Sequence, residues 1–179
     1  HLSDGAIYNY ITGDEYVDTF GAWDWDLVPG ITVDYGGTPL QCTKVKNKGK
    51  KAFVGGATDG NTGIAVMDYL NPQNQNLTFK KTVFFFPSGY AVQVGPVTSK
   101  NTDAPLVTVL DQRRRNGDIY VSGSLRNTDT TYATTKSNSI WHDRIGYYFP
   151  TSENLFVNSK PKASNWSDIG ISEGTETQQ

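Results

Sequence analysis

The sequence predicts an all-β protein, an antiparallel β-sandwich built from many strands. Thr, Val, Tyr, Phe, Gly and Asn are plentiful, whereas stretches of Ala, Leu, Glu and Lys with a helical period are few. Short strand-like runs also recur between turn residues, with no helical segment between them. This spacing is typical of sandwiches and stacked sheets rather than of βαβ units.

The strand-like runs follow one another along most of the chain. Their alternating pattern and the turn signals beside them predict strands at Lys51–Gly56, Gly63–Leu70, Leu77–Phe86, Gly89–Thr98, Leu106–Asp111, Asp118–Gly123, Ser137–His142, Ile145–Phe149 and Asn154–Ser159.

The breaks between these runs carry turn chemistry. Asp59-Gly60-Asn61, Asn71-Pro72 and Pro87-Ser88-Gly89 each separate two consecutive runs. Asn116-Gly117 lies between strand-like flanks and predicts a hairpin turn.

Length, charge and cysteine content restrict the class of protein. A chain of 179 residues predicts one domain over residues 1–179. The net charge of −2, from 16 basic and 18 acidic residues, points to neither a nucleic acid nor a membrane surface as partner. No apolar run approaches the roughly 20 residues of a membrane span. The single cysteine, Cys42, excludes an internal disulfide framework. Two acceptor sequons, at Asn76 and Asn165, favour a secreted, extracellular protein.

Histidine chemistry is limited because the chain has only His1 and His142. A Ser–His–Asp site would have to use His142, which lies between two strand-like runs in a tight His-Asp-Arg turn. We predict that His142 is a turn residue rather than a general base, and the sequence predicts no catalytic residues.

Residues 20–35, FGAWDWDLVPGITVDY, combine tryptophans with aspartates. Asp24, Asp26 and Asp34, with a carbonyl near Tyr35, offer the hard oxygen ligands that Ca²⁺ prefers. The alternative is period-2 alternation, in which Asp24 and Asp26 face solvent while the neighbouring tryptophans face the core. Both interpretations stay open at this point.

Two basic clusters stand out, Lys44–Lys51 and Arg113–Arg115. Either offers cations for an anionic polysaccharide, and arginine grips carboxylate or sulfate in bidentate fashion. For the lysine cluster, which contains Asn47 and Gly49, a solvated loop is the alternative.

Several motifs then occur in an order that resembles a known family. They are Gly13-Asp14-Glu15-Tyr16, Trp23-Asp24-Trp25-Asp26, Pro29-Gly30-Ile31-Thr32, Phe53-Val54-Gly55-Gly56, Lys80-Lys81-Thr82-Val83, Trp141-His142-Asp143 and Asn165-Trp166-Ser167-Asp168. From about Tyr8 to Asp168 the chain resembles the central β-sandwich of the family-8 polysaccharide lyases, which include chondroitin, hyaluronate and xanthan lyases. The resemblance implies a supersandwich of the galactose-mutarotase-like type, and a fragment or a stand-alone version of a larger lyase β domain.

The resemblance also bears on chemistry. Family members carry an α/α toroid whose Asn, His, Tyr and Arg cleave uronic-acid glycans by β-elimination, and this sequence has no counterpart of those residues. Some members hold calcium in the β domain; carried over, its ligands here are Asp24, Asp26, Asp34 and the Tyr35 carbonyl.

Three functions follow as hypotheses. The first is a non-catalytic, lectin-like domain that binds a polysaccharide, with candidate contacts at Trp23, Trp25, Arg113, Arg114, Trp141, His142 and Trp166. The second is one chain of a processed lyase that acts with a separate toroid chain. The third is a structural domain that binds a protein partner or itself through an exposed former interface.

Overall fold

A computed structural model describes residues 3–40, 48–126, 128–165 and 175–178. Within these ranges all regular structure is strand, and every strand pairing is antiparallel, which confirms the predicted all-β class. In the same ranges no helix has the length and apolarity to cross a membrane. The chain divides into two compact units, His1–Tyr8 with Asp24–Asp111 and Asn9–Trp23 with Gln112–Gln179, and each is described by itself.

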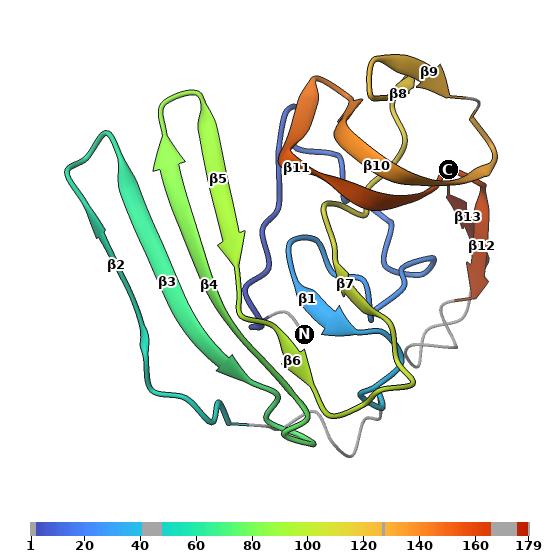
Figure 1. Ribbon diagram of the computed structural model, residues 1–179. Coiled ribbons are helices and arrows are strands. Elements are labelled where there is room, and N and C mark those ends of the chain that lie inside the picture. Colours follow the sequence, from blue (N-terminus) through green and yellow to red (C-terminus); the bar gives the residue numbers. More distant parts are fainter. Residues whose placement is uncertain (1–2, 41–47, 127, 166–174, 179) are drawn as a thin grey trace. The chain divides into compact units, whose positions relative to one another are not determined.

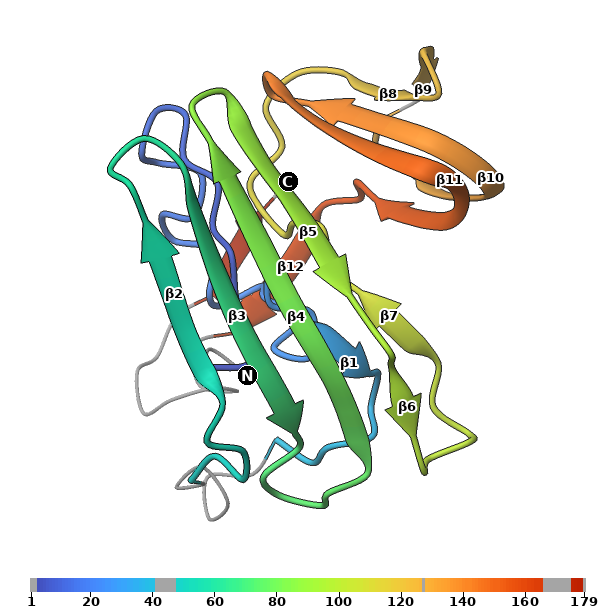
Figure 2. The same cartoon turned by 60° about the vertical axis from the view of Figure 1, so that its left-hand side comes forward.

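The first unit is built on one broad sheet. Strands β2 (Val54–Thr58), β3 (Gly63–Leu70), β4 (Leu77–Phe86) and β5 (Gly89–Val94) lie side by side in that order, and β6 (Thr98–Ser99) pairs with the start of β4 (Figures 1 and 2). β3 and β4 have the predicted bounds, and the predicted turns join β2 to β3, β3 to β4 and β4 to β5.

One face of this sheet forms a core. Along β4, Leu77, Phe79 and Val83 are buried at alternate positions, as the period of a strand requires. Phe79 stacks on Tyr69 of β3 with the ring centroids 4.5 Å apart. Burial of these large side chains stabilises the unit by roughly 2 kcal/mol for each one.

Lys81 takes part in the same buried row although it is charged. The residue is 3% exposed, and its ammonium donates to the carbonyl oxygens of Gly5 at 2.5 Å and Gly30 at 2.6 Å. Burial lowers the pKa of Lys81 to about 8.

Gly30 has a φ of +83°, and a Cβ there would lie 2.6 Å from the backbone nitrogen of Ile7, so this turn requires glycine.

A second core of the first unit lies beneath a short ribbon. β1 (Thr32–Asp34) pairs with β7 (Leu106–Thr108). Val28, Ile31 and Val33 are almost fully buried there. β7 lies within the strand predicted at Leu106–Asp111, whereas β1 was not predicted, because three residues are too few to show a period.

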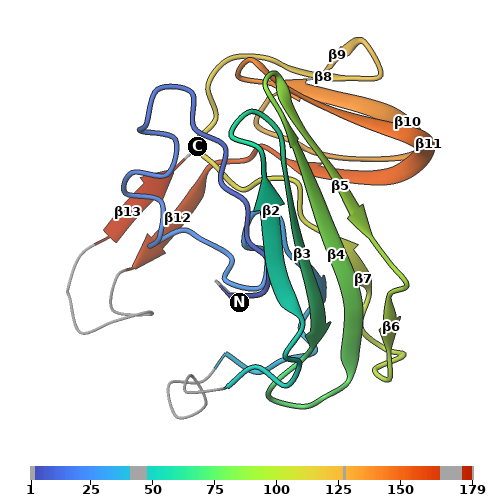
Figure 3. The same ribbon diagram turned by 90° about the vertical axis from the view of Figure 1, so that its left-hand side faces the viewer.

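The second unit holds a four-stranded sheet in the order β11-β10-β8-β9 (Figure 3). Its strands are β8 (Ile119–Val121), β9 (Ser124–Arg126), β10 (Thr131–His142) and β11 (Ile145–Asn158). A further ribbon pairs β12 (Lys162–Asn165) with β13 (Thr175–Gln178). The two strands predicted at 145–149 and 154–159 are one continuous strand, β11, and the pairing of β10 with β11 shifts register around Ser137.

The hairpin predicted at Asn116-Gly117 is wrong. β7 pairs with β1, whereas β8 pairs with β9 and β10, so the strands on either side of this dipeptide are not partners. Gly117 does adopt a positive φ of +82°, which is the local feature that the sequence signal reported.

Candidate functional site

A loop around Glu15 begins the candidate site in the second unit. The Glu15 side chain is 3% exposed, and its carboxylate accepts backbone N–H groups from Ile11 at 2.6 Å, Thr12 at 2.7 Å and Gly13 at 3.0 Å. Burial acts to raise the pKa of Glu15, but these N–H donors outweigh it and hold the pKa well below its usual range. The carboxylate therefore closes the loop as an anion.

Arg113 joins this loop to the sheet. Its side chain is 4% exposed and lies 3.4 Å from the Glu15 carboxylate and 3.5 Å from that of Asp143. The guanidinium also donates to the Asn9 carbonyl at 3.2 Å and lies 5.7 Å from the centre of the Tyr16 ring. The sequence predicts that Arg113 grips a polysaccharide. This geometry gives it instead the position of a buried crosslink, and a direct glycan contact stays a prediction.

The turn between β10 and β11 carries His142 and Asp143. Asp143 and Arg144 have φ values of +48° and +63°, the backbone of a two-residue type I′ hairpin. This confirms the tight turn predicted at this place. Asn116 holds this turn in place through two hydrogen bonds. Its side-chain amide donates to Asp143 Oδ1 at 2.8 Å, and its backbone N–H donates to His142 Nε2 at 3.1 Å.

The contacts of His142 fix its state near neutral pH. Burial lowers the pKa of His142, the neighbouring Asp143 carboxylate opposes this, and the Arg113 and Arg115 cations act in the same direction as burial. A neutral ring with Nε2 as acceptor agrees with the hydrogen bond from Asn116. The nitrogen that a general base would use is therefore occupied.

The opposite face of the same sheet presents aromatic rings. In the strand register Trp141 lies opposite Tyr120 on β8 and Gly146 on β11, and Tyr148 follows two residues after Gly146. Because side chains alternate between the two faces of a sheet, these residues share one face. With Leu125, which lies opposite Tyr120, they form what we call the aromatic face: Leu125, Tyr120, Trp141 and Tyr148.

The rings of the aromatic face are open to solvent. Trp141 is 41% exposed and Tyr148 is 77% exposed. Tyr120 meets Trp141 edge to face with the centroids 5.6 Å apart. Gly146 lies beside the indole, where an added Cβ would make ordinary van der Waals contact with Trp141 Cδ1 at 3.7 Å. Neighbouring exposed rings on one face form a patch, unlike single apolar residues scattered over a surface.

The other predicted glycan contacts lie in different settings. Trp23 is 7% exposed and packs against Tyr16 and Phe20, with centroids 6.0 Å and 4.9 Å away, so it is a core ring. Trp25 is half-buried and belongs to the first unit. Arg114 is exposed, and its backbone N–H donates to the Glu15 carbonyl at 3.0 Å.

Some predicted residues lie outside the described part of the chain. These are Trp166, with most of the sequon that begins at Asn165, and Lys44 and Lys46 of the lysine cluster. Within the cluster's described residues, Lys51 lies 3.8 Å from Asp68 and is largely exposed, in agreement with the alternative of a solvated segment.

The aspartates proposed for calcium belong to the first unit. Residues 24–27 form a turn rather than a strand, so the alternation expected for Trp23 to Asp26 is wrong. Asp24 Oδ1 accepts the Asp26 N–H at 3.0 Å, and Asp24 Oδ2 accepts the Tyr35 hydroxyl at 2.9 Å. The Asp24 contact is the main cause that raises the Tyr35 pKa.

Asp34 is buried separately from these contacts. It is 0% exposed and Oδ2 accepts the Ser99 hydroxyl at 3.2 Å, while Oδ1 is buried without a hydrogen-bond donor among the described residues. A lone buried carboxylate oxygen suits a cation, but within those residues no three Asp, Glu, His or Cys side chains gather to hold one. The four proposed ligands thus do not form one set here, and calcium binding remains a prediction.

Sequence reasoning missed several residues of the site. Glu15 was noticed only as part of a motif, and nothing local shows that it meets Arg113 from a distant part of the chain. Tyr120 and Tyr148 each lie in a predicted strand, but their gathering beside Trp141 depends on the pairing of β8, β10 and β11. Only a known strand register identifies such a face.

Comparisons with known proteins cover the whole chain. The family model described as polysaccharide lyase family 8, super-sandwich domain, matches residues 1–179. Chondroitinase-AC of Pedobacter heparinus is 33% identical over 177 residues, which are 96% of this chain and 24% of that protein. The polysaccharide lyase 8 family protein HylA of Enterococcus faecalis is 27% identical over 179 residues, 94% of this chain and 12% of that protein.

A solved structure is similar in fold as well. It is a chondroitinase AC lyase whose active site was studied in enzyme–oligosaccharide complexes, and it matches with a TM-score of 0.90 and 28% identity. The match covers 100% of this chain and 27% of that one. The chain thus spans about a quarter or less of the length of these relatives.

Proposed function

Because the chain belongs to polysaccharide lyase family 8 through its super-sandwich domain, we propose that it holds an acidic glycan and transfers no protons itself. The observation that carries this proposal is the aromatic face of the β8–β11 sheet. Pyranose rings present apolar C–H faces edged by hydroxyls, and the exposed rings of Trp141 and Tyr148 offer matching flat surfaces.

The polar groups of the second unit support holding rather than cleavage. His142 is the only histidine in the described part of the chain, and its Nε2 already accepts a backbone N–H. The Glu15 carboxylate is buried among three N–H donors and Arg113, so it is not placed to abstract a proton. These groups build a scaffold.

The names of the relatives suggest the ligand. Chondroitinase-AC is named for an acidic polymer, and we extend that ligand class to the present chain as part of the proposal. Acidic polymers of the chondroitin class are found outside cells, so we also place the protein there, as the sequons led us to expect.

Chondroitin oligosaccharides provide the test, with binding measured by titration calorimetry. We expect Trp141→Ala to weaken binding about tenfold, or ~1.4 kcal/mol. The matched control is Phe156→Ala. Phe156 is 67% exposed and lies near the end of β11, away from Tyr148. Equal affinity of both variants and the unmodified chain would remove the aromatic face from the proposal. Absence of any binding, together with self-association in solution, would favour the structural alternative.

A second candidate function is one part of a lyase that cleaves by β-elimination together with a toroid on another chain. The observation that favours it is the match to chondroitinase-AC, which covers 96% of this chain but 24% of that protein. Ultraviolet absorbance of unsaturated uronate measures this reaction. We expect none from residues 1–179 alone, and turnover by this chain unaided would overturn the non-catalytic proposal.

A further inference from the structure

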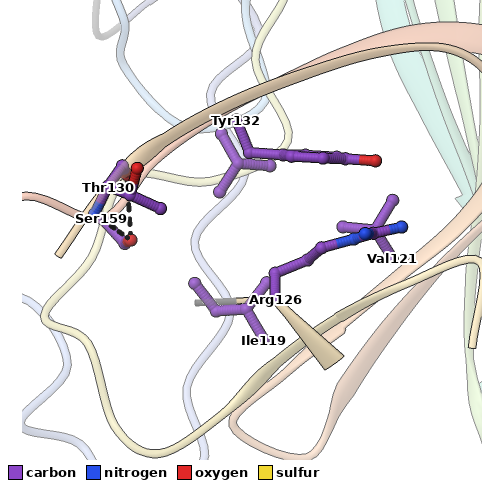
Figure 4. Close-up of a pocket in the computed structure, with 7 residues that line it drawn as sticks. Ile119, Val121, Arg126, Thr130, Tyr132 and Ser159 are labelled. Carbon is purple, nitrogen blue, oxygen red and sulfur yellow. Dashed lines mark hydrogen bonds between the residues drawn. The ribbon is translucent and has the colours of Figure 1, made fainter. Parts of the chain in front are cut away.

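A narrow crevice lies on the other face of the β8–β11 sheet, opposite the aromatic face. Its walls are mainly apolar, with one cation among them (Figure 4). The lining residues are Ile119, Val121, Arg126, Thr130, Tyr132, Val157 and Ser159.

Arg126 is held in this crevice by a ring. Its guanidinium carbon lies 4.4 Å from the centre of the Tyr132 ring, and Figure 4 shows the two side chains extending alongside each other. Such a contact fixes the plane of the guanidinium. Ile119 and Val121, which are 6% and 1% exposed, provide a rigid apolar floor.

The cation has no anion beside it among the residues that the structure describes. Arg113 and Arg115 of the same unit each lie within 3.5 Å of a carboxylate, Arg115 at 3.3 Å from Asp129. Arg126 Nε is also buried without an acceptor among the described residues. The nearby Ser159 hydroxyl is paired with Thr130, because it donates to the Thr130 carbonyl at 3.1 Å and accepts the Thr130 N–H at 3.4 Å.

This combination favours an external oxyanion. A half-buried guanidinium without a counter-ion is costly, and an incoming anion recovers part of that cost. The crevice itself is filled by side chains, so a ligand meets the edge of the guanidinium at the mouth. A planar fork of N–H donors matches the two oxygens of a carboxylate or a sulfate better than an ammonium does.

We propose that Arg126, held over Tyr132, is a subsite for an oxyanion carried by the glycan, either a uronate carboxylate or a sulfate ester. The inference rests on the proposed function for the identity of the glycan but not for the binding of the anion. It adds charge recognition on one face of the sheet to ring stacking on the other.

The first test uses polysaccharides that differ in the charge they carry and in the chemical group that carries it. Polygalacturonate oligosaccharides carry carboxylates, dextran sulfate carries sulfates, and dextran carries neither. We expect Arg126→Gln to weaken binding of at least one charged polymer about tenfold and to leave any binding of dextran unchanged. The polymer that is affected identifies the oxyanion.

Two further variants keep the test decisive. Arg126→Lys retains the charge without the fork, so we expect it to lie between Gln and the unmodified chain. Lys136→Gln, which removes an exposed cation of the same unit, should change binding by less than twofold. If Arg126→Gln binds both charged polymers as the unmodified chain does, or if Lys136→Gln causes an equal loss, the inference is overturned.

A small-molecule arm separates this inference from the proposed function. The side-chain Nε–H signal of Arg126 is followed by NMR during titration with glucuronate and with inorganic sulfate. A saturable shift that vanishes in Arg126→Gln supports the oxyanion subsite even if no glycan binds, in which case only the proposed function fails. Glycan binding without any such shift overturns the subsite and leaves the proposed function standing, and the absence of both removes both.

Discussion

Replacement of Arg113 by Met should destabilise the second unit by about 3 kcal/mol. Removing one partner of a buried ion pair costs about 3–5 kcal/mol, because the remaining charge stays buried without compensation. Asp143 lies 3.5 Å from the guanidinium and would retain the amide of Asn116. Glu15 would retain three backbone N–H donors, so the lower end of the range applies.

Urea unfolding followed by tryptophan fluorescence measures this loss. For a protein of this size 1 kcal/mol corresponds to roughly 2–4 °C in Tm, so thermal unfolding should occur roughly 6–12 °C lower. Arg114→Met is the matched control, because Arg114 is exposed and its backbone hydrogen bond to Glu15 survives the change. We expect that control to stay within about 0.5 kcal/mol of the unmodified chain. Equal losses at both positions would refute the reasoning.

A double variant tests whether charge is the cause. When Asp143→Asn is added to Arg113→Met, the buried carboxylate that lost its partner becomes neutral. We expect the double variant to be more stable than Arg113→Met alone, which reveals coupling between the two residues. If the second change adds a further loss, lost packing rather than an uncompensated charge explains the first result.

Three other predictions concern single features. His142→Gln should flatten the pH dependence of stability below about pH 6.5. There His142 binds a proton in the unfolded chain, whereas burial lowers its pKa in the folded chain, so the free energy of unfolding decreases as the pH is lowered. Between pH 8 and 10.5 the unfolded chain keeps the Lys81 proton that the folded chain releases. The free energy of unfolding, measured by urea titration at each pH, should therefore increase with pH over this range, and Lys81→Met should remove the increase. Calcium should release heat in calorimetry and raise Tm, and both effects should disappear in Asp24→Ala and Asp26→Ala; no heat from the unmodified chain would discard the calcium hypothesis.

Strands with strong local signals were predictable. β3 and β4 begin and end at the predicted residues because Gly63 follows the Asp59-Gly60-Asn61 turn, Asn71-Pro72 ends β3, and Pro87 ends β4. In the core, the buried alternation along β4 follows from the sequence too. Lys81 continues that buried alternation as a charged residue, and its accommodation depends on two carbonyls from other segments, which no local pattern reports.

Pairing over long distances in the chain was not predictable. Asn116-Gly117 has the chemistry of a hairpin turn, but Asn116 is used to fix the β10–β11 turn through His142 and Asp143. The side-chain amide and backbone N–H of one residue thus serve a distant turn. The same dependence on register explains why Trp141 was named as a glycan contact while Tyr120, its cross-strand neighbour, was missed.

Salt separates the two roles that arginine plays in this unit. Arg113 is buried with the carboxylates of Glu15 and Asp143, so dissolved salt screens these ion pairs little. The loss of their attraction should therefore change the urea midpoint little as the salt concentration rises. Arg126 has only Nε fully buried, so an anion bound at its outer edge remains in contact with water and competes with the ions of the buffer. Affinity for charged polymers should therefore fall steeply as salt rises, while the fold keeps its stability. If binding and stability decline together, the anion is held by the buried cluster and the two arginines have been assigned to the wrong roles.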